Sequence, residues 1–189
     1  MYIINEVKGE DYQAYLIGDV IRNISKYDPH SWFNDFNRNF TYNNSAHSKY
    51  ILRQFFAGPE VKEITSEITE DLLSLFGNDW LPNNVRPSIG LQELRNEDQS
   101  SDFNSAVPPH SDHGHYYGFT IFLNKGWNVE WGGWNFILSA KENKVVMSTP
   151  PTFNTGVLIK TPCLHGACPV WDKKARRTIQ IFYTFKNKK

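Results

Sequence analysis

Three residues of the chain combine the ligand types and the spacing of a mononuclear metal site. His110 and Asp112 stand two apart in the run P-H-S-D-H-G-H, and His165 follows in the run T-P-C-L-H-G-A-C-P-V. On extended backbone, side chains two apart leave the same face, so His110 and Asp112 can converge on one ion. Two imidazoles and one carboxylate that leave positions open suit Fe(II) in dioxygen chemistry. We therefore expect His110, Asp112 and His165 to be the metal ligands and the catalytic residues.

An arginine beyond His165 could bind an anion beside such a metal. Arg176 and Thr178 share one face of a predicted strand with Gln180. A guanidinium can hold a carboxylate through two parallel hydrogen bonds, and the Thr178 hydroxyl could donate to the same carboxylate. The opposite face carries the apolar residues Ile179, Ile181, Tyr183 and Phe185. Because that apolar face should pack against helices, the alternation favours Arg176 over Arg177 as the anion-binding residue.

Other polar or aromatic residues near these motifs have two readings. His113 and His115 could contact a substrate, but histidines in such a loop are often solvent-exposed or only support the ligands. Trp131 lies in a predicted turn, Lys125–Gly133, where it could grip a substrate or pack beneath the loop. Cys163 and Cys168 bracket His165, yet a structural zinc site needs four ligands and no second pair has zinc spacing. We expect these two cysteines to be buried thiols.

The clearest element that could support these residues is a helix over 59–76. Gly58-Pro59 is a start signal, because proline tolerates the first helical position, and Gly77 can end the helix. Apolar residues recur every three or four positions and predict one buried stripe, made of Val61, Ile64, Ile68, Leu72 and Leu75. Weaker helical patterns cover Asp11–Ile24 and Lys49–Phe56, and the Asn-rich segment Asp28–Asn44 is typical of a loop.

The residue pattern of the second half of the chain predicts short β-strands. Segments rich in β-branched and aromatic residues are separated by Gly, Pro and Asn, and they are Ser88–Leu94, Tyr116–Asn124, Trp134–Leu138, Val145–Met147, Gly156–Thr161 and Arg177–Phe185. This spacing favours an antiparallel sandwich or barrel. We expect one α+β domain over 1–189: a jelly-roll core at 88–185, with a mainly helical region at 1–87 that packs on one sheet.

The amino-acid composition argues against nucleic acids and membranes as binding partners. The 189 residues carry 20 Lys+Arg and 20 Asp+Glu, so the chain lacks the basic surplus typical of nucleic-acid binders, apart from the short run Lys186–Lys189. No apolar run is long enough to cross a membrane, and the first residues show no secretory signal. We therefore expect a cytoplasmic protein that binds neither nucleic acid nor a membrane. The sequence leaves the oligomeric state open.

In their order along the chain, these motifs resemble the prolyl-4-hydroxylase-like 2-oxoglutarate/Fe(II) oxygenases. The matching runs are H-S-D (110–112), T-I-F-L-N-K-G-W (120–127), W-G-G-W (131–134), P-C-L-H-G-A-C-P-V (162–170) and R-R-T-I-Q-I-F-Y (176–183). The resemblance implies a double-stranded β-helix, iron on the H-x-D…H triad, and Arg176 bound to the distal carboxylate of 2-oxoglutarate. Two features depart. Phe122 stands where many prolyl hydroxylases have a tyrosine that helps hold the co-substrate, and the tyrosine frequent before the H-x-D is missing, with Gln92, Glu93 and Arg95 in that neighbourhood.

This resemblance implies a dioxygenase that hydroxylates an unactivated C–H bond, with Fe(II), 2-oxoglutarate and dioxygen, and with ascorbate as a candidate reductant. Related halogenases lose the carboxylate of the triad, so Asp112 favours hydroxylation or another oxidation. We favour a prolyl residue in a peptide or protein as the substrate. One alternative is a free amino acid or another small metabolite, and a further one is a cupin-like binding module without turnover.

Overall fold

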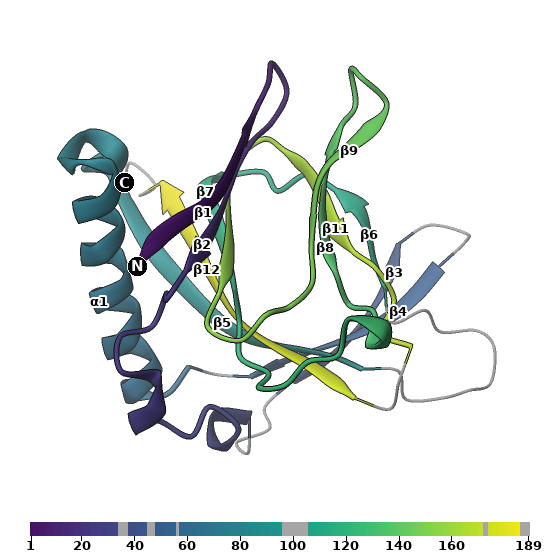
Figure 1. Cartoon of the computed structure of the whole chain (residues 1–189), viewed down its shortest axis with the longest axis horizontal. Helices are drawn as coiled ribbons and strands as arrows, with labels where there is room; N and C mark the ends of the chain where they lie inside the picture. Colours follow the sequence, from purple (N-terminus) through teal and green to yellow (C-terminus); the bar gives the residue numbers. More distant parts are fainter. Residues whose placement is uncertain (34–37, 45–47, 56, 96–105, 172–173, 186–189) are drawn as a thin grey trace.

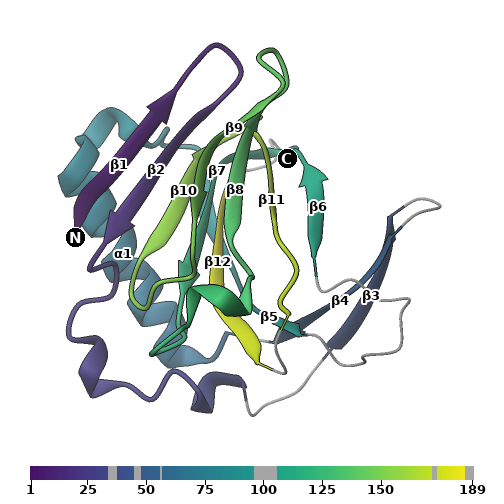
Figure 2. The same cartoon turned by 45° about the vertical axis from the view of Figure 1, so that its right-hand side comes forward.

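The computed structural model describes residues 1–33, 38–44, 48–55, 57–95, 106–171 and 174–185. Two antiparallel sheets face each other, and helix α1 (Pro59–Phe76) lies along the outer face of the larger one (Figures 1 and 2). This arrangement confirms the jelly-roll core with helical cover on one sheet. In the described residues, no helix is long and apolar enough to span a membrane.

The larger sheet has eight strands in the order β1 (Tyr2–Lys8), β2 (Gln13–Gly18), β10 (Gly156–Lys160), β7 (His115–Phe122), β12 (Ala175–Phe185), β5 (Val85–Arg95), β4 (Ser48–Phe55) and β3 (Arg38–Asn44). The smaller sheet has four strands in the order β6 (Val107–His110), β11 (Leu164–Ala167), β8 (Asn135–Ser139) and β9 (Lys144–Thr149). Short 3₁₀ turns connect some of them: η1 (Ile24–Lys26), η2 (Ser31–Phe33), η4 (Asn78–Trp80) and η5 (Val129–Trp131). All six predicted strand segments of the second half lie within or largely within these strands.

The structure corrects the expectation of a mainly helical region at 1–87. Strands β1 to β4 precede α1, and the expected helices over Asp11–Ile24 and Lys49–Phe56 are wrong. Strand β2 lies inside the first segment, and β4 covers nearly all of the second. Pairing decided the outcome: β2 hydrogen-bonds to both β1 and β10, which outweighs a weak helical period. The segment expected as a loop supplies β3, which pairs with β4 as a hairpin.

Helix α1 forms as its sequence predicts. Pro59 stands at the first helical position, and the Gly77 N–H donates to the Leu73 carbonyl at 2.9 Å, with Gly77 at a φ of 90° that favours glycine. Its stripe packs against the outward face of β12, where Ile179, Ile181 and Tyr183 are fully buried. The Tyr183 hydroxyl also lies 3.1 Å from Thr69 Oγ1 of the helix. The helix therefore fixes the strand that carries Arg176 on its other face.

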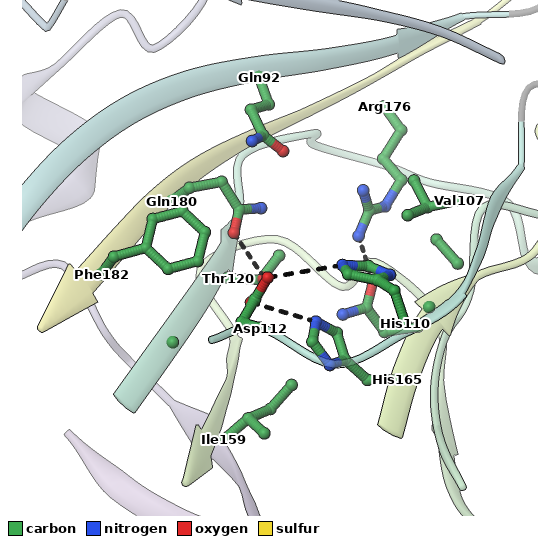
Figure 3. Close-up of a pocket in the computed structure, with 14 residues that line it drawn as sticks. Gln92, Val107, His110, Asp112, Thr120, Ile159, His165, Arg176, Gln180 and Phe182 are labelled. Carbon is green, nitrogen blue, oxygen red and sulfur yellow. Dashed lines mark hydrogen bonds and ion pairs between the residues drawn. The ribbon is translucent and has the colours of Figure 1, made fainter. Parts of the chain in front are cut away.

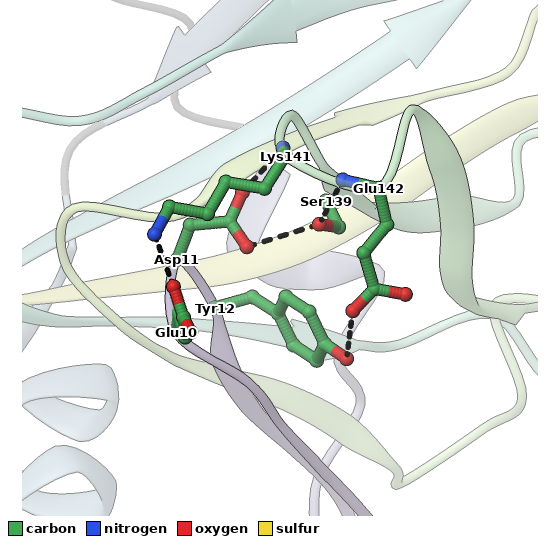
Figure 4. Close-up of polar contacts among 6 residues, drawn as sticks. All are labelled: Glu10, Asp11, Tyr12, Ser139, Lys141 and Glu142. Carbon is green, nitrogen blue, oxygen red and sulfur yellow. Dashed lines mark hydrogen bonds and ion pairs between the residues drawn. The ribbon is translucent and has the colours of Figure 1, made fainter.

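The two sheets are joined at one end by a clasp of polar residues between the β1–β2 turn and the β8–β9 turn (Figure 4). The Asp11 carboxylate accepts hydrogen bonds from Ser139 Oγ at 3.0 Å and from the Lys141 backbone N–H at 3.1 Å. Lys141 also pairs with Glu10. The Lys141 N–H bond is the main cause that lowers the pKa of Asp11 below its usual 3.8. The clasp holds β8, a neighbour of the strand that carries His165, against the larger sheet.

Replacing Ile68 by Ala should lower the free energy of unfolding by about 2–5 kcal/mol, because a fully buried side chain of the α1 stripe is lost and leaves a cavity. Urea denaturation would measure the change. Glu63→Ala, an exposed position of the same helix, is the control and should stay within about 0.5 kcal/mol of the parent. Equal effects of the two variants would contradict the packing of α1 on the sheet.

Replacing Asp11 by Asn should lower the melting temperature at neutral pH. Because the folded-state pKa of Asp11 is depressed, its contribution is present above about pH 4 and is lost as the pH falls through the folded-state value. The difference in melting temperature between parent and variant should therefore shrink on acidification, and thermal scans across this range would measure it. Glu10→Gln, which removes only the exposed partner of Lys141, should have a smaller effect. A difference that grows in acid would contradict the role of Asp11.

Candidate active site

The three predicted ligands meet between the two sheets. His110 ends β6 and His165 lies on β11, where they are direct cross-strand partners, and Asp112 follows in the adjoining loop. His110 Nε2 lies 3.7 Å from Asp112 Oδ1, and His165 Nε2 lies 3.5 Å from Asp112 Oδ2. Both separations are too long for hydrogen bonds but suit neighbouring ligand atoms on one ion. The three ligand atoms all lie within 4.8 Å of one another.

Each imidazole is oriented for metal binding by a backbone carbonyl. His110 Nδ1 lies 2.9 Å from the Pro108 carbonyl oxygen, and His165 Nδ1 lies 2.9 Å from the Cys163 carbonyl oxygen. A carbonyl only accepts, so each Nδ1 donates its hydrogen and each Nε2 keeps a lone pair toward Asp112. Burial lowers the pKa of His165, which keeps its ring neutral as a ligand must be. The donor set therefore fits a divalent ion such as Fe(II).

Arg176 is a buried cation. Its side chain is 4% exposed, and in the described part of the chain no carboxylate pairs with it. Nη2 donates to Asn135 Oδ1, the guanidinium carbon lies 5.1 Å from the centre of the Phe122 ring, and Nε is buried without an acceptor. Burial lowers the pKa of Arg176 to about 10, so the group still carries its charge at neutral pH. Such a cation calls for an anionic ligand.

A cavity of about 330 Å³ connects the triad with Arg176 (Figure 3). Its volume is in the range of small-ligand sites. The lining residues besides these four come from both sheets and are mostly uncharged: Gln92, Val107, Gly118, Thr120, Asn135, Ile159, Gly166, Ala167, Gln180 and Phe182. The triad lies at one place in this cavity and the Arg176 guanidinium at another. This arrangement suits a ligand that chelates a metal ion at one end and carries an anionic group at the other.

The backbone of the W-G-G-W run passes close to the Arg176 side chain, which explains the glycine at position 133. A Cβ atom on Gly133 would lie 3.1 Å from Arg176 Cδ and 3.3 Å from the Trp127 ring, and its φ of 69° favours glycine. The Trp127 indole N–H donates to the Gly132 carbonyl oxygen at 3.0 Å. This turn therefore packs beneath the aliphatic stem of Arg176 and holds it in place.

The sequence profile of the 2OG-Fe(II) oxygenase superfamily matches residues 98–184, the segment that contains the triad and Arg176. The chain is similar to the 2OG-Fe(II) oxygenase superfamily over these residues. It is accordingly a dioxygenase, and the superfamily implies Fe(II) and 2-oxoglutarate. A search of curated protein sequences finds no significant match.

Solved structures share the fold of this oxygenase at low sequence identity. A prolyl hydroxylase from Trichoplax adhaerens, solved with a hypoxia inducible factor oxygen degradation domain peptide fragment, has a TM-score of 0.64 at 16% identity, over 92% of this chain and 84% of its own. The carbocyclase SnoK from nogalamycin biosynthesis has a TM-score of 0.62 at 10% identity, over 91% and 79%. A Pseudomonas putida prolyl-4-hydroxylase has a TM-score of 0.54 at 14% identity, over 73% and 70%.

The other predicted site residues lie outside the cavity of the oxygenase. His113 is exposed, and the His115 ring lies 4.6 Å from the Phe182 ring, with Nδ1 2.9 Å from Thr184 Oγ1. Trp131 lies against Trp127, with ring centres 5.4 Å apart. Thr178 is fully buried, and its hydroxyl accepts from Gln180 Nε2 at 3.1 Å. Substrate contact by the first three, and co-substrate contact by Thr178, stay predictions.

The cavity also contains residues that the motifs did not single out. Thr120 and Gln180 are cross-strand partners on β7 and β12, and the Thr120 hydroxyl donates to Gln180 Oε1 at 2.8 Å. Asn135 contacts Arg176 from the opposite sheet, although it lies in the predicted strand Trp134–Leu138. A signal was present, since an asparagine in an otherwise apolar strand needs a polar partner when buried.

We propose that His110, Asp112 and His165 are the iron ligands of this oxygenase. His165→Ala should then lower Fe(II) affinity at least about 100-fold, more than the usual cost of losing a group that only supports a ligand. Anaerobic titration calorimetry with Fe(II), or with Co(II) as a spectroscopic substitute, would measure it. His113→Ala, a matched change in the flanking loop, should bind the metal as the parent does. If the two variants lost affinity equally, the assignment of the triad would be wrong.

Proposed function

We propose that this oxygenase hydroxylates an unactivated C–H bond, and that its substrate is a prolyl residue in a peptide or protein. One observation carries the assignment of the cavity: Arg176, charged and buried without a carboxylate partner in the described part of the chain, lines the same cavity as the three metal ligands. In this proposal Arg176 binds the distal carboxylate of 2-oxoglutarate.

Iron and 2-oxoglutarate, when bound, supply the oxidising chemistry of the superfamily, and the protein supplies their positions. His110 and His165 present Nε2 to the metal because the carbonyls of Pro108 and Cys163 hold their other nitrogens. Asp112 adds the negative charge. Its carboxylate leaves no room for a halide at that position, which favours hydroxylation.

The lining favours a substrate without charges near the reacting carbon. Among the described residues that line the cavity, Asp112 and Arg176 are the charged side chains, and the proposal already assigns these two and the two histidines. A free amino acid would bring an ammonium and a carboxylate that lack partners there. A prolyl residue within a peptide brings only amides, which match Gln92, Gln180 and Thr120, and its apolar ring can pack against Phe182.

The fold agrees with this choice without deciding it. The Trichoplax adhaerens structure, similar over most of both chains, is a prolyl hydroxylase solved with a peptide fragment. SnoK has a comparable TM-score and is a carbocyclase from nogalamycin biosynthesis, so the fold serves small molecules as well. A small metabolite is therefore the second candidate substrate. The third alternative, a binding module without turnover, is less well supported. Retaining an anion would require only a cation such as Arg176, whereas this cavity also has two histidines and a carboxylate in a metal-binding arrangement.

The deciding experiment combines purified protein with Fe(II), 2-oxoglutarate, ascorbate and air, and offers proline-containing peptides and free amino acids in parallel. We expect succinate formation that rises with a peptide, together with a mass gain of one oxygen atom on a prolyl residue. Mass spectrometry of peptide and small-molecule fractions would measure both.

His165→Ala is the control and should form no succinate. A gain of oxygen on a free amino acid alone would move the assignment to the small-metabolite alternative. Loss of 2-oxoglutarate that is independent of dioxygen, or equal in the His165→Ala variant, would contradict catalysis at this centre. Omitting ascorbate from parallel reactions would show whether it serves as the reductant.

A further inference from the structure

We infer that Asn135 is a second carboxylate-binding residue of the co-substrate site and positions Arg176 for the same carboxylate. The inference rests on the proposed function of the cavity, and it concerns what makes this chain select a 2-oxo acid with a distal carboxylate. Asn135 is 5% exposed, lies on β8 of the smaller sheet and reaches across to Arg176 of the larger sheet. Both side chains line the cavity.

The orientation of the Asn135 amide follows from its partner. A guanidinium has only donors, so the atom of Asn135 that faces Arg176 Nη2 must be the oxygen. The NH₂ group of the same amide then points away from the guanidinium. In the described part of the chain, no protein acceptor takes a hydrogen bond from that NH₂ group, although the residue is nearly buried. Its donors are therefore available to a ligand in the cavity.

The Arg176 guanidinium is only partly paired in the described part of the chain. Its Nε is buried without an acceptor in the described part of the chain, while Nη2 is held by Asn135. The aromatic ring of Phe122 lies against the guanidinium and offers no hydrogen bond of its own. A carboxylate beside Arg176 would thus find donors from two side chains on opposite sheets.

The spacing along β8 suits a short diacid. His165 is paired with Ile137, and Asn135 stands two residues before Ile137 on the same face of β8. Since a strand rises about 3.4 Å per residue, Asn135 lies about 7 Å along the strand from the level of the metal ligand. A five-carbon 2-oxo diacid that chelates the metal at one end would bring its other carboxylate to this level.

The test compares two ligands that differ only at the distal end. Iron-loaded protein would be titrated without dioxygen with 2-oxoglutarate and with 2-oxopentanoate, in which a methyl group replaces the distal carboxylate. The visible charge-transfer band of the chelated 2-oxo acid reports binding in each case. Asn135→Leu keeps the size of the side chain and removes its polar atoms. We expect this variant to bind 2-oxoglutarate about 10- to 100-fold more weakly, as for a lost hydrogen bond to a charged group. Its affinity for 2-oxopentanoate should be unchanged.

Asn135→Asp provides a second variant of the same shape. The new carboxylate would pair with Arg176 and repel the ligand, so 2-oxoglutarate should bind still more weakly than to Asn135→Leu, again without loss of 2-oxopentanoate. Unaltered 2-oxopentanoate binding shows in each variant that the metal centre and the fold are intact. Equal weakening of both ligands, or an unchanged affinity for 2-oxoglutarate, would overturn the role of Asn135.

Arg176→Met separates a failure of this inference from a failure of the proposed function. If Arg176→Met loses its preference for 2-oxoglutarate and the Asn135 variants keep theirs, the anchor is right and Asn135 is not part of it. If Arg176→Met keeps the full preference, Arg176 does not bind the distal carboxylate. In that case the proposed co-substrate site and the inference both fail.

Discussion

The constraint that shapes this molecule is the burial of a positive charge between two sheets. Transfer of a guanidinium from water to a protein interior costs several kcal/mol unless partners replace the lost solvation. The described residues supply only part of that replacement, namely the amide oxygen of Asn135 and the ring of Phe122, and they leave Nε without an acceptor. The rest of the core must outweigh this cost, and a bound anion would reduce it. Binding of a dianionic co-substrate should therefore also stabilise the fold.

Strand β12 resolves the conflict between that charge and the surrounding apolar core. Its two faces serve two environments: Ile179, Ile181 and Tyr183 join the cluster under α1, while Arg176 and Gln180 line the cavity. A shift of one residue in register would exchange the two sets and bury the polar row under the helix. Pairing along the full length of β5 and most of β7 prevents such a shift. The helix, remote from the triad of His110, Asp112 and His165, thus acts on the site by fixing one register.

This alternation explains which parts of the molecule the sequence could predict. The sequence predicted the site residues of the H-x-D motif, His165 and Arg176, because side chains two residues apart on a strand share a face. The structure brings these residues to one cavity. The helix at Pro59–Phe76 was readable from its stripe and its two caps. Strands β2 and β4 were not, since their pairing with distant strands, rather than local preference, makes them strands. The asparagine in an apolar strand indicates that Asn135 needs a polar partner, but no local pattern identifies Arg176 as that partner, because the contact joins residues of different sheets.

Hydrogen-bond direction connects these findings at the level of single atoms. Carbonyl oxygens fix the imidazoles of His110 and His165 so that lone pairs face the centre, and a guanidinium fixes the amide of Asn135 so that its donors face away from Arg176. In each case a partner with one kind of hydrogen-bonding atom removes the ambiguity of a side chain that has two kinds. The cavity consequently presents acceptors where a cation should bind and donors where an anion should bind. Because these directions are set by backbone carbonyls and a buried charge within paired strands, they exist before any ligand arrives, which reduces the ordering that binding would otherwise require.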